Sequence, residues 1–141
     1  MQNILTLFKV LSDKSRLRTL LLLMKKELCV CQLIEILRLS QPLVSRNLNL
    51  MHRAGLIEAR REGKLVFYSL RKDLPKEFIL IIKVVEDYLV DKVDIKGDLK
   101  NLKRCEEFIN SIGRCDVKLF RAFMRGQGRG LRRLKKGVSV A

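Results

Sequence analysis

Apolar residues recur every three to four positions through the first third of the chain, the spacing of helices that bury one face. This period predicts helices over residues 4–11, 14–26, 30–37 and 41–52. Ser12 or Asp13 can cap the second helix and Ser40 the fourth, since short polar side chains accept hydrogen bonds from exposed helix N–H groups. Pro42 falls in the first turn of the fourth helix, and Gly55 suits the left-handed position after its end.

After Gly55 the apolar period changes to two, which is typical of strands. Residues 56–61 and 65–70 therefore predict a β-hairpin, joined by Glu62-Gly63-Lys64. A fifth helix over 76–90 has a side that is almost wholly apolar, which consists of Phe78, Ile79, Ile81, Ile82, Val85, Tyr88 and Leu89. One small domain does not normally bury that much surface, so this helix is expected at a subunit interface.

The order of these elements is that of a winged helix-turn-helix. The predicted fold class is mostly α with a β-hairpin (ααααββα), homodimeric through the first and fifth helices. Residues 1–91 form the DNA-binding and dimerisation domain in this interpretation. Residues 92–141 form a basic, partly helical C-terminal extension, with helices near 98–112 and 116–124 and a flexible basic tail after Arg125.

Charge supports a polyanionic partner. The 141 residues carry a formal charge of +15 and a pI near 10.2, and such an excess favours binding to phosphates. No segment reaches the roughly 18 apolar residues of a membrane span, and the N-terminus lacks the pattern of a signal peptide. Four cysteines without such a signal predict a reducing, cytoplasmic setting and thiol or metal chemistry instead of disulfides.

Polar residues on the fourth helix and the hairpin have the chemistry of DNA readout. Gln and Asn suit adenine edges, and Arg suits guanine or phosphate. The predicted DNA contacts are Ser40, Gln41, Pro42, Ser45, Arg46, Asn47 and Asn49 on the helix, with Arg60, Arg61 and Lys64 on the hairpin. The helix would lie in the major groove and the hairpin on neighbouring phosphates or in the minor groove.

Cys29 and Cys31 stand at the start of the third helix, directly before the predicted reading helix. In a regular helix, residues two apart point about 200° away from each other. We therefore expect that one ion bound by both thiolates unwinds this helix start and so weakens DNA binding. The helix N-terminus also stabilises thiolates, which makes both residues better ligands.

Several of these motifs together resemble the ArsR/SmtB family of metalloregulatory repressors. They are Leu11-Ser12-Asp13-Lys14-Ser15-Arg16-Leu17-Arg18, Glu27-Leu28-Cys29-Val30-Cys31, Leu39-Ser40-Gln41-Pro42-Leu43-Val44-Ser45-Arg46 and the segment 54–64. The resemblance covers about residues 3–90 and implies a homodimeric repressor that binds an imperfect palindrome in double-stranded operator DNA and releases it when an ion binds. Asn47 departs from the family, which usually has His there.

Within the family, Cys-Val-Cys resembles the site for As(III) and Sb(III). A further Cys commonly follows where this chain has Ile34, so only two thiolates are local. The candidates for a third ligand are Cys105 or Cys115 from either subunit, a small thiol or hydroxide. Cd(II) and Pb(II) also suit thiolates, whereas zinc prefers four ligands. The fifth helix lacks the histidines of the family's interfacial zinc site.

Two alternatives remain. One is a repressor of the same fold that responds to thiol oxidation, joining Cys29 or Cys31 to Cys105 or Cys115. The other is a nonspecific nucleic-acid-binding protein, suggested by the basic tail. Catalysis is not expected, because the sequence has no Cys-x-x-Cys, Ser/His/Asp set, paired-carboxylate site or phosphate-binding glycine loop, and no resident cofactor is required.

Overall fold

The computed structural model describes residues 4–113 and 116–125. The helices are α1 (Ile4–Leu11), α2 (Lys14–Lys25), α3 (Val30–Leu37), α4 (Gln41–Arg53), α5 (Lys76–Leu89), α6 (Val93–Ile112) and α7 (Val117–Met124). The strands are β1 (Leu28–Cys29), β2 (Ile57–Glu62) and β3 (Leu65–Leu70). The winged helix-turn-helix fold is thereby confirmed. Cys115 and the predicted basic tail lie outside the described residues.

The wing is a hairpin of β2 and β3 to which β1 adds a third strand. The antiparallel order is β1-β3-β2, and Cys29 of β1 stands opposite Phe67 of β3. Gly63 in the hairpin turn has φ +60°, a conformation that costs glycine little. The sequence pattern did not predict β1. Through it, the segment that leads into α3 is hydrogen-bonded to the wing.

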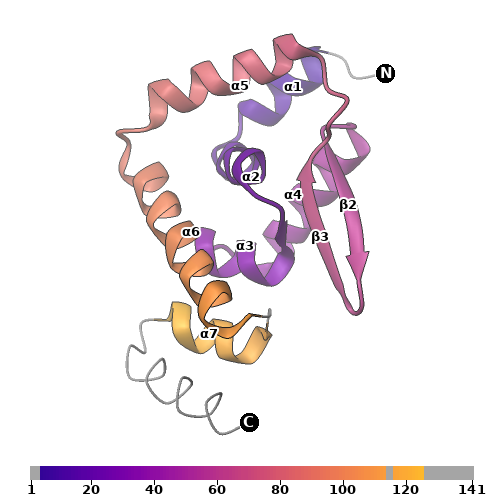
Figure 1. Cartoon of the computed structure of the whole chain (residues 1–141). Coiled ribbons are helices and arrows are strands. Elements are labelled where there is room, and N and C mark those ends of the chain that lie inside the picture. The colour runs from indigo at the N-terminus through magenta and orange to yellow at the C-terminus, as the bar shows by residue number, and fades with distance from the viewer. Residues whose placement is uncertain (1–3, 114–115, 126–141) are drawn as a thin grey trace, which may run out of the picture.

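α2 lies at the centre of the molecule, with the other elements arranged around it (Figure 1). Its residues Leu20 to Leu23 are buried in succession, which explains a nearly continuous apolar run in the sequence. α4 buries Val44, Leu48 and Met51 at helical spacing, so its opposite face is turned outward. The same core therefore supports the predicted reading helix and holds its polar side toward solvent.

The C-terminal extension packs on this core. α6 begins at Val93, five residues before the predicted start at Asp98, and buries Ile95, Leu102 and Phe108. The Phe108 ring meets Phe120 of α7 edge to face, with centroids 5.4 Å apart. The two parts of the chain share one hydrophobic core. The division into domains at residue 91 stays a prediction.

One end of the molecule exposes apolar side chains. α1 and α5 lie at the end opposite α7 (Figure 1). Leu80, Val84 and Tyr88 follow one face of α5 and are 59%, 66% and 77% exposed, and Leu5 and Phe8 of α1 are 62% and 49% exposed. None of the described helices combines the length and apolar character that a transmembrane helix requires.

Candidate metal centre and nucleic-acid interface

The two thiols meet in the structure. Cys29 ends β1 and is buried, and Cys31 lies in the first turn of α3 and is half-buried. Their Sγ atoms are 2.8 Å apart, much longer than the roughly 2.04 Å of a disulfide bond. The pair therefore presents two adjacent sulfur donors to one side of the α3 N-terminus.

This geometry contradicts the premise of one expectation from the sequence, that the two sulfurs point about 200° apart. Both sulfurs converge while α3 stays fully helical from Val30. The angular argument fails because Cys29 is not a helical residue: its φ of −90° and ψ of 168° are extended. The two sulfurs thus converge beside an intact helix, so the angular argument gives no reason for the helix to unwind.

Gln32 fixes the backbone of Cys29. The buried Gln32 side chain accepts a hydrogen bond from the Cys29 N–H through Oε1 at 2.9 Å. Gln at the third helical position commonly reaches back to the residue before the helix in this way. The spacing Cys29-x-x-Gln32 is thus a signal in the sequence that places Cys29 before the helix, and the prediction of a helical Cys29 missed it.

A hollow of about 300 Å³ opens beside the thiols. It is lined by both cysteines together with Gln41 of α4, Lys64 of the wing turn, Tyr68 of β3 and Arg121 of α7. An occupant of this space would touch the thiols, the start of the reading helix and the wing at once. The cations around it suit a site whose ligands are thiolates.

The hollow provides two local sulfur ligands. Metal–sulfur bonds of about 2.3 Å in a tetrahedral arrangement hold two sulfurs roughly 3.8 Å apart, so a bound ion requires the pair to open by roughly 1 Å. Among the described residues no three Cys, His, Asp or Glu side chains are grouped to hold an ion. Cys105 lies in α6, buried in the core. The third ligand stays open.

The outer face of α4 carries most of the predicted DNA contacts. Ser40 caps the helix, accepting a hydrogen bond from the Leu43 N–H at 3.4 Å, and Pro42 occupies the first turn as expected. The exposed residues are Ser40, Gln41, Pro42, Arg46 and Asn49, and Ser45 is half-buried. These side chains are placed where a helix can present them to a groove.

Asn47 is an exception. Its side chain is 2% exposed, and its Nδ2 donates to Ser15 Oγ at 2.9 Å. Ser15 in turn donates to Asp13 Oδ2 at 2.6 Å, and this bond lowers the pKa of Asp13. The placement contradicts the expectation that Asn47 contacts DNA, because its polar atoms are turned into the protein. It fastens α4 to the start of α2.

The cations of the wing differ in their surroundings. Arg60 is exposed but already has partners within the chain: it bonds Glu27 at 2.6 Å and Glu62 at 3.0 Å, and its guanidinium lies 5.1 Å from the centre of the Phe67 ring. The Arg60 hydrogen bonds lower the pKa of Glu27. Within the described residues, the exposed Arg61 and Lys64 have no acidic partner, so they are the better placed to meet phosphates.

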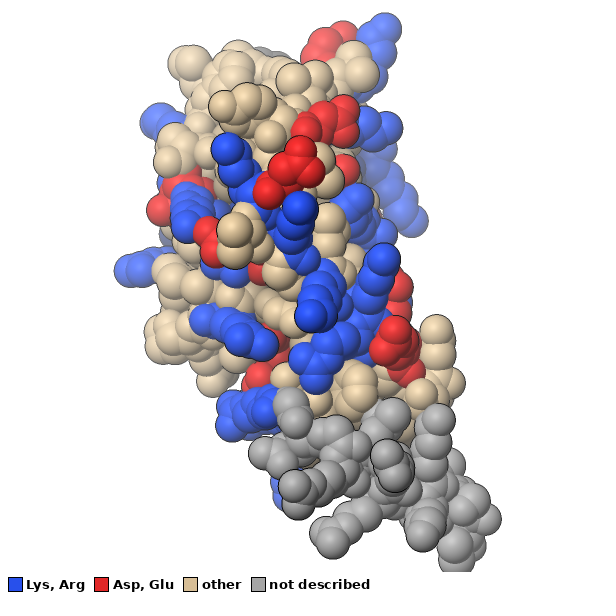
Figure 2. All heavy atoms as spheres, turned by 90° about the vertical axis from the view of Figure 1, so that its left-hand side faces the viewer, with Lys and Arg blue, Asp and Glu red and all other residues tan. Residues whose placement is uncertain are grey.

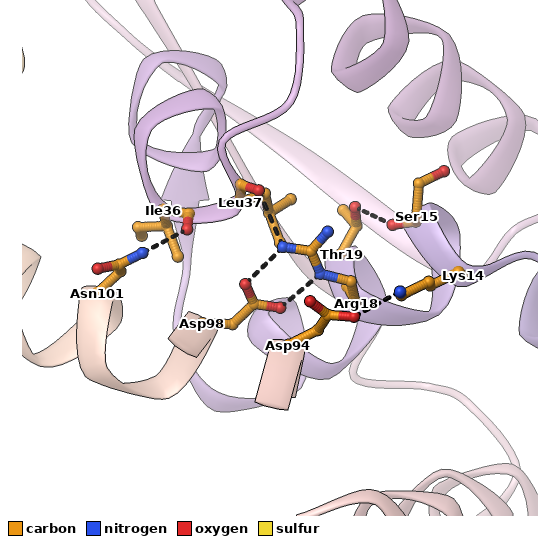
Figure 3. A network of polar contacts seen from close by, with 9 residues as sticks. All are labelled: Lys14, Ser15, Arg18, Thr19, Ile36, Leu37, Asp94, Asp98 and Asn101. Atoms are coloured by element: carbon orange, nitrogen blue, oxygen red, sulfur yellow. Dashed lines mark hydrogen bonds and ion pairs between the residues drawn. The ribbon is translucent and has the colours of Figure 1, made fainter. Parts of the chain in front are cut away.

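A buried ion pair joins the extension to the helix-turn-helix (Figure 3). Arg18 of α2 donates to both carboxylate oxygens of Asp98 at 2.7 and 2.8 Å and to the Leu37 carbonyl at 2.9 Å. Asn101 donates to the Ile36 carbonyl at 2.9 Å. Burial raises the pKa of Asp98, against the opposing effect of Arg18. No sequence pattern indicates this pair, because its members are 80 residues apart.

The last carbonyls of α3 are thus held by side chains from α2 and α6. The last four C=O groups of a helix have no partner within it. Leu37 and Ile36 supply two of them, and Arg38, the residue after α3, takes a left-handed conformation with φ 56°. The extension therefore stabilises the end of α3 next to the turn into α4.

Comparison with known proteins agrees with this fold. Residues 13–59 match the family described as "Bacterial regulatory protein, arsR family". The chain is 39% identical over 99 residues to the arsenical resistance operon repressor of Escherichia coli, covering 70% of this chain and 83% of that protein. It is 36% identical to a cadmium resistance regulatory protein CadC homolog of Staphylococcus aureus, covering 55% and 64%.

A solved structure of similar fold is HlyU from Vibrio cholerae, with a TM-score of 0.56 and 31% identity, covering 62% of this chain and 92% of that one. About 38% of this chain has no counterpart in that structure. With its helix-turn-helix and wing, this chain belongs to the ArsR family of transcriptional regulators.

Proposed function

We propose that the protein is a homodimeric repressor that binds operator DNA through α4 and the wing and releases it when As(III) or Sb(III) binds Cys29 and Cys31. The observation that carries the proposal is the pair of sulfurs 2.8 Å apart, in a hollow that also reaches Gln41 and Lys64. A soft trivalent ion suits thiolate ligands. The thiols are expected to be kept reduced in the cytoplasm.

The coupling we propose runs through β1 and the hollow. When an ion separates the sulfurs, Cys29 moves relative to its strand partner Phe67, so β3 and the wing shift with it. Cys31 lies in the first turn of α3, and the ion and its third ligand occupy space beside Gln41. Either displacement misaligns the wing and α4, which must fit one duplex together.

The dimer is proposed to form through α1 and α5. Leu80, Val84 and Tyr88 lie at positions i, i+4 and i+8, and helices that expose such a stripe commonly bury it against a partner. The exposed Leu5 and Phe8 of α1 lie at the same end of the molecule. Two copies would then present two α4 helices to two half-sites of one palindrome.

The identity of the inducer is tested by release of DNA. The protein is bound to a fluorescent duplex from the region upstream of its own gene, and arsenite, antimonite, Cd(II) and Pb(II) are added in turn. We expect anisotropy to fall with arsenite and antimonite at the lowest concentrations and to recover when a dithiol competes for the ion. Binding no tighter than to a random duplex would contradict the repressor and favour the nonspecific nucleic-acid-binding protein.

One observation favours a redox-responsive repressor that forms a bond between Cys29 and Cys31, in place of the bond to Cys105 or Cys115 expected from the sequence. Because Cys29 is extended, its sulfur already lies beside that of Cys31, closer than an arrangement within a helix would allow. Mild oxidation followed by peptide mass spectrometry separates the two candidates. A single defined disulfide that lowers DNA affinity, with no effect of arsenite on the reduced protein, would establish the redox function instead.

A further inference from the structure

Basic side chains gather where α6 and α7 meet the turn between α3 and α4. Arg38 and Arg104 line two hollows of about 450 and 330 Å³; Arg125 joins them in the first and Lys100 in the second. Figure 2 shows Lys and Arg side chains crowded over the face of the molecule that carries α6. We call these four residues the extension cluster.

The acidic groups beside these hollows already have cationic partners. Asp98 is bound by Arg18 at 2.7 Å, Asp94 by Lys14 at 2.5 Å, and Glu35 by Arg125 at 3.3 Å. Within residues 4–113 and 116–125, no acidic side chain pairs with Arg38, Lys100 or Arg104. The cluster therefore keeps a local excess of positive charge at a half-open surface.

The extension cluster adjoins the start of the reading helix. Leu39 lines the first hollow, and the next residue, Ser40, caps α4. Arg121 of α7 lies one turn before Arg125. It lines the thiol hollow together with Gln41 and Lys64. In helix-turn-helix proteins the element before the recognition helix crosses the DNA backbone, and helix N-termini attract phosphate.

We infer that the extension cluster binds backbone phosphates of the duplex beside the groove that α4 enters, so that α6 and α7 enlarge the DNA footprint. This inference rests on the proposed DNA binding and deepens it. Duplex DNA is favoured over other polyanions because the cluster adjoins the predicted groove-reading face. The contacts would add affinity without sequence preference, as phosphate contacts do.

The test compares two double variants of the full-length protein. Arg38→Gln with Lys100→Gln removes two cations of the cluster, both on exposed positions. The matched control, Lys72→Gln with Lys76→Gln, removes two cations between β3 and the start of α5, outside the cluster. Affinity for a random-sequence duplex of about 30 base pairs, a length that holds many phosphates, is measured by anisotropy over a range of salt concentrations.

The plot of log affinity against log salt becomes shallower by about 0.9 for each phosphate that the protein no longer neutralises, hence by about 1.8 for each protomer and by about 3.6 for the proposed dimer. We expect this change in the cluster variant only, with an equal fold loss on upstream and random duplexes. An unchanged slope, an equal change in the control, or a loss confined to single-stranded RNA or anionic vesicles would overturn the inference. If the wild-type protein binds upstream and random duplexes equally well, the proposed repressor function is refuted. The slope comparison would still test whether the extension cluster binds phosphates.

Discussion

Cys29 shows how the conformation of one residue sets the chemistry of a site. The spacing of Cys29 and Cys31 identified the pair from the sequence, and the position before the reading helix indicated its role. The relative direction of the sulfurs was mispredicted, because it depends on whether Cys29 is helical or extended. That choice is made by pairing with Phe67, nearly forty residues away, and a two-residue strand has no period of its own to reveal it.

The Arg18–Asp98 pair is expected to be a large contributor to stability at the level of single residues. Removing one member of a buried pair leaves the other charge without compensation, at a cost of about 3–5 kcal/mol. Asp98→Ala should therefore lower the free energy of unfolding, measured in urea, by about that amount. Asp94→Ala, which removes the exposed pair with Lys14, should cost less than about 1 kcal/mol. Equal losses would contradict this account.

Glu27 gives a prediction on pH. Its hydrogen bonds from Arg60 lower its folded-state pKa below the ordinary 4.5. A lowered pKa contributes stability that is present above 4.5 and is lost as pH falls through the folded-state value. NMR titration of the Glu27 carboxyl should find its midpoint below 4.5, and Arg60→Gln should move the midpoint upward. A midpoint that the substitution leaves in place would show that Arg60 is not the cause.

At the scale of elements, periodicity predicted most of the fold. Helices α1 to α5 and the hairpin were found because each repeats its pattern over six residues or more. β1 was missed, since two residues are too few to show a period. The first turn of α6 was missed as well: Ile95 belongs to its buried face, but the neighbouring Val93 is exposed and Gly97 is a poor helix former.

Substitutions on the two faces of α4 should affect different properties: the buried face stability, the exposed face DNA affinity. Asn47→Ala removes the buried hydrogen bond to Ser15, so we expect a loss of about 1–3 kcal/mol in unfolding free energy. Asn49→Ala, on the exposed face, should leave stability within about 0.5 kcal/mol. It should instead weaken operator binding by about 1–3 kcal/mol, as expected where an adenine edge is read. Urea unfolding and anisotropy measure the two quantities. A reversed pattern would mean that Asn47, not Asn49, reads the base.

At the scale of the whole molecule, exposed apolar side chains lie at the end formed by α1 and α5, and the extension cluster lies near α7 at the other end. The sequence predicted an apolar side on α5 and an excess of cations after residue 91. Of the α5 residues expected at an interface, Phe78 and Ile82 are buried in the core, and the exposed stripe is Leu80, Val84 and Tyr88. How the extension packs was not predictable, because Arg18 and Asn101 reach partners far along the chain. In the fold, the same extension both stabilises the end of α3 and contributes cations beside α4.

A charged residue in the exposed stripe of α5 (Leu80, Val84 and Tyr88) should dissociate the proposed dimer. Val84→Glu places a carboxylate on a 66% exposed apolar position, which a subunit interface would have to bury. We expect sedimentation velocity to show a folded monomer with weaker operator affinity. The control is Leu50→Glu on α4, also an exposed apolar residue, which should stay dimeric. A dimeric Val84→Glu variant would place the interface elsewhere.

The most direct test of the central claim is arsenite-dependent release of the upstream duplex by the wild type and by the variant with Cys29→Ser and Cys31→Ser. Cys105→Ala, measured in parallel, shows whether the buried thiol of α6 is needed as a third ligand. We predict that arsenite weakens wild-type binding by about 5- to 150-fold, the usual range of coupling between two sites, and leaves the double variant bound to DNA. If the double variant still releases DNA on adding arsenite, the thiol pair is not the site that controls DNA binding.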